Sequence, residues 1–96
     1  MNYSKNEPEI WTDLGYGFNF NYNIQQIETD YSYDSVFVNK KERNLLIQSL
    51  IHAKYSTDDE IALVNNYNTG LNIDKYNEYQ LFRNECKNIV SNTIFD

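Results

Sequence analysis

The two side chains best suited to acid–base or nucleophilic chemistry near neutral pH each occur once in this sequence, as His52 and Cys86. A catalytic histidine needs a nucleophile or an orienting carboxylate close to it in space, and no motif links His52 to either. Cys86 falls on the apolar stripe of an expected helix and is interpreted as a small buried hydrophobe. We therefore predict no catalytic residue and no enzyme.

The densest run of possible metal ligands is Asp58-Asp59-Glu60. Adjacent positions on a helix do not face one another, so the three carboxylates cannot converge on one ion. The run also lacks the spacing of a calcium-binding loop. One cysteine and one histidine exclude a cysteine-based zinc site. The run is interpreted as the start of a helix, and neither a metal nor another cofactor is expected.

Phosphate and nucleic-acid recognition are also disfavoured. Gly15-Tyr16-Gly17 lacks the spacing of a phosphate-binding loop and does not open a helix. Lys40, Lys41 and Arg43 form the one basic cluster, which is short and is interpreted as solubilising. The helix–turn–helix pattern near Ser56 places acidic residues where a recognition helix would meet DNA. No direct nucleic-acid partner is expected.

The feature of the sequence that most suggests a function is a run of aromatic residues at alternate positions. Tyr16, Phe18, Phe20, Tyr22 and Ile24 occupy every second position, which predicts a strand with one apolar face. That face could be an ordinary core face or an interface, because tyrosine and tryptophan are enriched at protein–protein contacts. The candidate interface residues are Trp11, Tyr16, Phe18, Phe20, Tyr22, Tyr31 and Tyr33.

Residues 1–38 are expected to form an extended arm with one or two β-strands, or a β-hairpin. The second β-prone stretch is 31–38, and residues 25–30 between the two stretches are interpreted as a turn or a longer excursion. The first dozen residues have few apolar side chains and resemble an arm with Trp11 as its anchor. Two strands alone are marginally stable in water, so they need the helical half or another chain. The sequence leaves open whether the strand pairs within the chain or between chains.

Residues 39–96 show helical spacing and are expected to form a three-helix module. The first helix is predicted to begin at Asn39, with Glu42 completing a capping-box pattern. The chain is therefore assigned to the α+β class, with an arm or β-hairpin over 1–38 followed by a three-helix module over 39–96.

The other two helices have clear boundary signals. Thr57 and Glu60 have capping-box spacing at the start of the second helix. Gly70 is predicted to end that helix in a left-handed conformation. The third helix is expected to start near Asp74 and to carry an apolar stripe that includes Tyr79 and Cys86.

The size, the charge and the composition of the chain exclude several classes of protein. Its 96 residues suit one small domain with a thin core and exclude a two-domain enzyme with an interdomain cleft. The net charge is -6, although 16% of the residues are aromatic. A single cysteine excludes an intrachain disulfide, and no apolar run is long enough to span a membrane. No targeting segment is visible, and an intracellular or virion setting is expected.

The helical half resembles a module of small virion-associated proteins of tailed phages that infect Bacteroides-like hosts, including crAss-like phages. The resemblance covers residues 46–87, about half of the chain. It rests on the stretches LIQSLIHAKYSTDDEIAL, from Leu46 to Leu63, and YNEYQLFRNECK, from Tyr76 to Lys87. The two share the same order of segments: an apolar helix, an acidic turn, a short apolar helix and a last helix rich in Glu, Tyr and Phe.

This resemblance implies a non-enzymatic structural protein of the head, a head fibre or the tail. Such a protein would be assembled in the host cytoplasm, reside in the virion, form a homo-oligomer and bind other virion proteins. Its aromatic N-terminal segment would dock by strand addition or by aromatic anchoring. The alternative is a small acidic phage-encoded inhibitor that mimics nucleic-acid charge and blocks a host defence or nucleic-acid enzyme.

Overall fold

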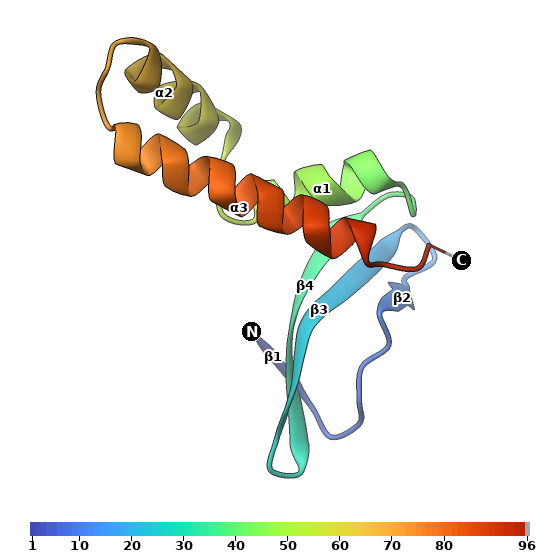
Figure 1. Cartoon of the computed structure of the whole chain (residues 1–96). Coiled ribbons are helices and arrows are strands. Elements are labelled where there is room, and N and C mark those ends of the chain that lie inside the picture. Colours follow the sequence, from blue (N-terminus) through green and yellow to red (C-terminus); the bar gives the residue numbers. More distant parts are fainter. Residues whose placement is uncertain (96) are drawn as a thin grey trace. The chain divides into compact units, whose positions relative to one another are not determined.

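The computed structural model describes residues 1–95 and has mixed α+β architecture, as the sequence predicted (Figure 1). Four strands precede three helices: β1 (Asn2–Ser4), β2 (Trp11–Asp13), β3 (Phe18–Ile27), β4 (Asp30–Val38), α1 (Arg43–His52), α2 (Thr57–Asn68) and α3 (Ile73–Ser91). The chain divides into two compact units, Met1–Leu46 and Ile47 onward, and each is described by itself.

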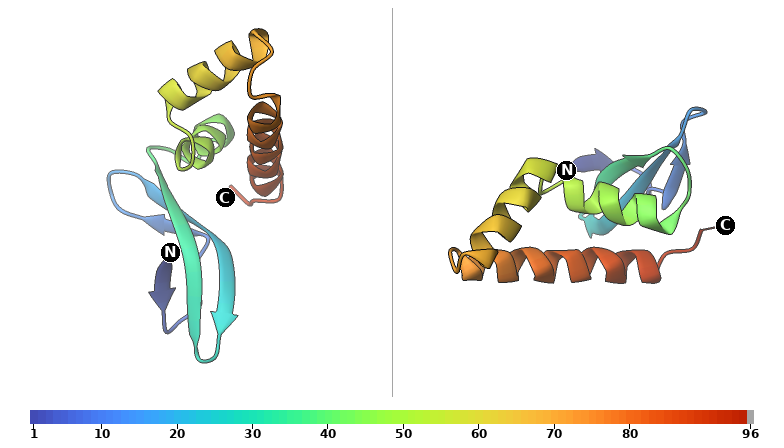
Figure 2. Two further views of the ribbon diagram at one scale, coloured as in Figure 1. Left: turned by 90° about the vertical axis from the view of Figure 1, so that its left-hand side faces the viewer. Right: turned by 90° about the horizontal axis from the view of Figure 1, so that it is seen from above.

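The first unit is a four-stranded antiparallel sheet with the strand order β1-β4-β3-β2. The long β3–β4 hairpin forms its centre, and Figure 2 shows the short β1 and β2 beside it. We expected one or two strands in this region, but residues 2–4 and 11–13 are strands as well. Strands of three residues are too short to show a period of two, so neither could be predicted from residue spacing. The central strands pair within the chain.

A β-bulge interrupts the expected alternation in β3. Tyr22 pairs with Asp34 and Gln25 pairs with Ser32, so β3 has one extra residue between these two pairs. Asn23 adopts a positive φ of 54° in this bulge. The period of two therefore holds for Phe18, Phe20 and Tyr22 but does not continue to Ile24.

The β3–β4 connection is shorter than the sequence suggested. Residues 25–27, which we expected in a turn or a longer excursion, belong to β3. Ile27 pairs with Asp30, which leaves a two-residue hairpin loop whose first residue, Glu28, has a φ of 56°. Tight hairpin loops of this kind require a positive φ, and glutamate gives no sequence signal for one.

The β2–β3 connection depends on two glycines. Gly15 has a φ of 86°, and its amide donates to Asp13 Oδ1 over 2.8 Å, which forms a tight turn. A Cβ on Gly17 would lie 2.6 Å from the Phe37 ring and 2.9 Å from the carbonyl oxygen of Val38. Glycine is therefore required at position 17 by the close approach of β4 to the start of β3.

The helices follow the predicted order with shifted starts. We expected α1 to begin at Asn39, but it begins at Arg43, and the amide of Leu46 donates to the carbonyl of Glu42. Ser56, not Thr57, is the N-cap of α2, and its partner in the capping box is Asp59. Capping-box spacing fits both Ser56–Asp59 and Thr57–Glu60, so the sequence pattern alone could not select the register.

The end of α2 agrees with the prediction. Gly70 has a φ of 78°, and its amide donates to the carbonyl of Tyr67 over 3.0 Å. The amide of Leu71 donates to the carbonyl of Asn66 over 2.7 Å. These two bonds form a Schellman motif, which ends the helix and turns the chain into α3 (Figure 2).

Each unit has its own set of buried side chains. In the first unit the buried apolar residues are Phe20, Val36, Val38 and Leu46. In the second they are Leu50, Ile51, Tyr79, Cys86 and Val90. None of these residues lies in α2, which has no buried residue at all. The helix must therefore be held by contacts that leave its side chains partly exposed.

Candidate protein-interaction surface

The strand register places six of the seven candidate interface residues on two different faces of the sheet, and the seventh, Tyr16, lies in the loop before β3. Residues that pair directly across antiparallel strands share a face. Trp11 pairs with Phe20, and Phe20 pairs with Val36. We call this side of the sheet the Phe20 face, which carries Trp11, Phe18, Phe20 and Tyr22. The opposite side, the Asn21 face, carries Tyr31, Tyr33 and Phe37.

On the Phe20 face the aromatic rings pack against one another. The ring centroids of Trp11 and Phe20 lie 5.1 Å apart, and those of Phe20 and Tyr22 lie 5.6 Å apart in a stacked arrangement. The ammonium of Lys41 lies 5.4 Å from the Trp11 ring centroid and 5.1 Å from that of Phe18. Phe20 is only 2% exposed, so at that position the alternation serves the interior of the protein.

On the Asn21 face the aromatic side chains reach solvent. Tyr16, in the loop before β3, lies with its ring centroid 5.9 Å from that of Phe37. Tyr16 is 77% exposed and Phe37 is 43% exposed, while Tyr31 and Tyr33 are half-buried. Because side chains two apart on a strand share a face, Tyr31, Tyr33 and Phe37 lie on one face of β4, with Ser35 between the last two. We call these four residues the β4 row: Tyr16, Tyr31, Tyr33 and Phe37.

A ladder of hydrogen-bonded polar side chains from all four strands crosses the same face of the sheet and passes between Tyr33 and Phe37 at Ser35. The amide nitrogen of buried Asn21 donates to Thr12 Oγ1 over 3.0 Å and to the carbonyl of Glu9 over 2.7 Å. Its oxygen accepts from the Ser35 hydroxyl over 2.6 Å, and Asn2 donates to that hydroxyl over 3.4 Å. The buried amide is thus fully engaged, and it fixes the strands that carry the β4 row.

Two exposed aromatic residues, Phe37 and Tyr3, were not among the residues predicted to lie at an interface. Phe37 was placed in a strand but not at an interface, because its exposure follows from the pairing of β4 with β3. Tyr3, which is 69% exposed, lies in the segment interpreted as an arm with few apolar side chains. It pairs with Ser32 and therefore belongs to the Phe20 face. The register places Phe37 on the face opposite Phe20, whereas Tyr3 is exposed although it shares the face of Phe20.

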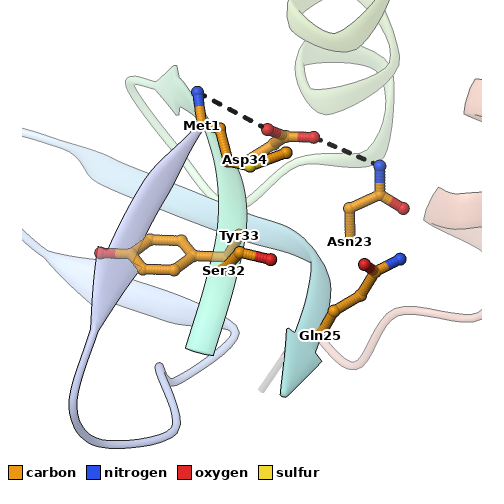
Figure 3. A pocket seen from close by; sticks show the side chains of 6 residues that line it. All are labelled: Met1, Asn23, Gln25, Ser32, Tyr33 and Asp34. Atoms are coloured by element: carbon orange, nitrogen blue, oxygen red, sulfur yellow. Dashed lines mark hydrogen bonds and ion pairs between the residues drawn. The ribbon is translucent and has the colours of Figure 1, made fainter. Parts of the chain in front are cut away.

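A small polar hollow lies next to the bulge in β3 (Figure 3). Asn23 donates to Asp34 Oδ2 over 3.2 Å, and the amino group of Met1 lies 3.9 Å from Asp34 Oδ1. The volume of the hollow is about 50 Å³, well below the roughly 300 Å³ of the smallest usual ligand pockets. Its six lining residues are Met1, Asn23, Gln25, Ser32, Tyr33 and Asp34.

In the second unit, Glu60 joins three helices through hydrogen bonds. His52, at the end of α1, lies with its Nε2 2.8 Å from Glu60 Oε1. The hydroxyl of Tyr79, on α3, donates to Glu60 Oε2. Because Asp59 completes the capping box, Glu60 is available for both contacts. No sequence motif linked His52 to a carboxylate. With the cap at Ser56 and not at Thr57, Asp59 takes the place in the capping box, and the Glu60 carboxylate contacts His52.

The environment of this group favours structure over nucleophilic chemistry. Burial, together with the hydrogen bond to Glu60, raises the pKa of Tyr79 to about 12, so this phenol forms a phenolate even less readily than an ordinary tyrosine does. Burial also raises the pKa of the Cys86 thiol, which is 1% exposed. A thiol in this state is a poor nucleophile.

No group of three or more His, Cys, Asp or Glu residues within 1–95 is arranged to hold a metal ion. Over the same residues, no helix is both long enough and apolar enough to cross a membrane. In comparisons with protein-family models, curated proteins and solved structures, the chain matched none of them.

Proposed function

We propose that this chain is a non-enzymatic structural protein of a tailed-phage virion that binds other virion proteins through its N-terminal unit. The β4 row carries the binding part of the proposal. In that row, the Tyr16 and Phe37 rings lie next to each other, and they are 77% and 43% exposed. The virion setting, in the head, a head fibre or the tail, is taken from the resemblance of residues 46–87.

The physical support for a docking role is the chemistry of the row. Tyrosine and phenylalanine provide large apolar areas, and the tyrosine hydroxyls add hydrogen bonds at the edge of a contact. The polar ladder centred on Asn21 holds the underlying strands in one register, so the rings are presented on a rigid support. A rigid surface loses less conformational entropy on binding than a flexible arm does.

An acidic inhibitor of a host enzyme remains the second candidate, because the net charge of -6 suits a basic target. The densest acidic run offers that role little support. The Asp59 carboxylate accepts from the amide of Ser56, and the Glu60 carboxylate is bound to His52 and Tyr79. Two of the three consecutive carboxylates are thus engaged within the chain.

Mass spectrometry of purified virions tests the proposal directly. A structural protein is expected in the particles at a fixed stoichiometry, whereas an inhibitor would be absent from them. Absence of the chain from purified particles would rule out the virion role.

Incorporation of variants tests the β4 row. We expect Tyr16→Ala combined with Phe37→Ala to leave the circular dichroism spectrum unchanged and to lower incorporation by roughly tenfold, as loss of an aromatic hot spot does. Tyr3→Ala is the matched control, because Tyr3 is similarly exposed but lies on the Phe20 face. Equal incorporation of the double variant and the wild type would remove the row from the docking surface.

A further inference from the structure

A second, larger hollow lies beside α2 in the helical unit, and none of the residues discussed for docking lines it. Its volume is about 340 Å³, within the range of small-molecule sites. Three segments contribute to its walls: the α1–α2 connection with Lys54 and Tyr55, the α2 helix with Ala62 and Leu63, and the start of α3 with Lys75.

The hollow lies beside α2 between two contacts that attach this helix to its neighbours. Near the start of α2, Glu60 binds His52 and Tyr79. Near its end, the Tyr67 ring stacks on the Tyr76 ring of α3, with centroids 4.0 Å apart. Between these two contacts, Ala62 and Leu63 line the hollow.

The charges around the hollow favour an anion. Lys54 and Lys75 are two of only eight basic residues in a chain with a net charge of -6. The one acidic side chain in the wall is Asp59, whose Oδ2 accepts from the amide of Ser56 over 3.1 Å. The wall therefore has a net positive charge, and its carboxylate is already engaged.

One of the two cations is held in place. The ammonium of Lys54 lies 4.8 Å from the ring centroid of Phe82 and 5.6 Å from that of Tyr55. Such cation–π contacts limit the positions of a lysine that would otherwise be free in solvent. The amide side chains of Asn66 and Asn72 also line the hollow and offer further hydrogen-bond donors.

We propose that this hollow binds a small organic anion, with a carboxylate beside Lys54 and Lys75 and a flat apolar body against Ala62, Leu63 and Tyr55. The apolar wall distinguishes this class from inorganic anions, and the two lysines distinguish it from neutral or cationic aromatic compounds. The proposal goes beyond the virion role and does not depend on it, because the site and the β4 row lie in different units.

Titration of the isotope-labelled full chain by NMR tests the site with three probes of known chemistry. Benzoate is expected to shift amide resonances within residues 54–75 in a saturable manner. Benzylamine has a similar ring with the opposite charge and is expected to leave them unchanged. Inorganic phosphate is expected to bind more weakly than benzoate. The proposal fails if benzoate leaves these resonances unchanged, if benzylamine shifts them equally, or if phosphate binds as tightly as benzoate.

Charge-matched variants locate the anion. We expect Lys54→Gln and Lys75→Gln each to weaken benzoate binding by about twofold to fivefold, the upper range for exposed charged contacts. Lys87→Gln changes the net charge of the chain by the same amount outside the hollow and is expected to leave the affinity unchanged. Equal effects of all three substitutions would mean that net charge, and not this site, attracts the anion.

Discussion

Nε2 of His52, at the end of α1, lies 2.8 Å from Oε1 of Glu60, in the first turn of α2. The second oxygen of the same carboxylate accepts from Tyr79 on α3. A single side chain thus bonds two other helices to a helix that contributes nothing to the buried core. This contact explains how α2 can keep its place although all of its side chains remain at least partly exposed.

Replacement of Glu60 tests this attachment. We expect Glu60→Ala to lower the free energy of unfolding by about 1–3 kcal/mol, because it leaves the buried Tyr79 hydroxyl without its acceptor. Chemical denaturation followed by circular dichroism measures the change. Asp58→Ala removes a neighbouring exposed carboxylate and is the control, with an expected effect below about 0.5 kcal/mol. Equal losses in both variants would show that Glu60 acts only as one of the acids at the helix start.

The ionisation of Tyr79 is expected to lower the stability of the folded protein at alkaline pH. The pKa of this phenol is raised from 10.0 to about 12 by burial and by the hydrogen bond to Glu60, so folding favours the neutral form. The resulting stability is fully present below pH 10 and is lost as the pH rises toward 12 and beyond. We expect the free energy of unfolding to fall more steeply above pH 10 in the wild type than in Tyr79→Phe. Parallel curves for the two proteins would contradict this assignment.

The position of the α2 cap can be tested by two single substitutions. Ser56→Ala removes the hydroxyl that accepts from the amide of Asp59 over 3.1 Å and is expected to cost about 1 kcal/mol. Thr57→Ala, one residue further on, is expected to change the stability by less than about 0.5 kcal/mol. Thermal unfolding of both variants decides the register, since the reverse order would restore the cap predicted at Thr57.

Gly17 is expected to tolerate no side chain. In Gly17→Ala the new Cβ would lie 2.6 Å from the Phe37 ring and 2.9 Å from the Val38 carbonyl oxygen. Because the backbone atom cannot move without shifting β4, we expect a loss of about 1–3 kcal/mol in the free energy of unfolding. Tyr16→Ala is the neighbouring control, since that side chain is mostly exposed. A Gly17→Ala variant as stable as the wild type would mean that β4 does not approach this closely.

The buried side-chain amide of Asn21 is expected to contribute more to the free energy of unfolding than Asn19, which lies on the same face of β3. Asn21→Ala removes the donor to Thr12 and Glu9 and the acceptor for Ser35, which should cost about 2 kcal/mol. Asn19→Ala, two residues earlier on β3, is the matched control. Urea denaturation compares them, and equal midpoints for both variants would show that the polar ladder adds no stability.

Much of the fold could be predicted from residue spacing because helices and long strands have different periods. Five alternating residues from Tyr16 to Ile24 predicted a strand where β3 is found, although the alternation stops at the bulge after Tyr22. Gly70 was correctly predicted as the left-handed end of α2. The two three-residue strands could not be predicted, because they are defined by their partners and not by their own pattern.

Which aromatic residues form the candidate surface depends more strongly on strand pairing between distant residues than the fold class does. The seven aromatic residues were chosen by type, and type does not distinguish Phe20, which is buried, from Tyr16, which is exposed. The pairing of Phe20 with Val36 and of Asn19 with Phe37 assigns each ring to a face. A shift of one residue in that register would exchange the faces, so exposure cannot be read from the alternation alone.

The sequence by itself determined the α+β class, the order of the long strands and helices and the acidic start of α2, because these follow from local spacing and local capping chemistry. The tertiary structure alone decided which aromatic rings reach solvent and which carboxylate meets His52. Both outcomes depend on single-residue registers, of β3 against β4 and of the cap at Ser56. The β3–β4 register is set by contacts between residues distant in sequence, which no local pattern contains. The cap is local, but the capping-box pattern fits Ser56 and Thr57 equally and therefore does not select between them.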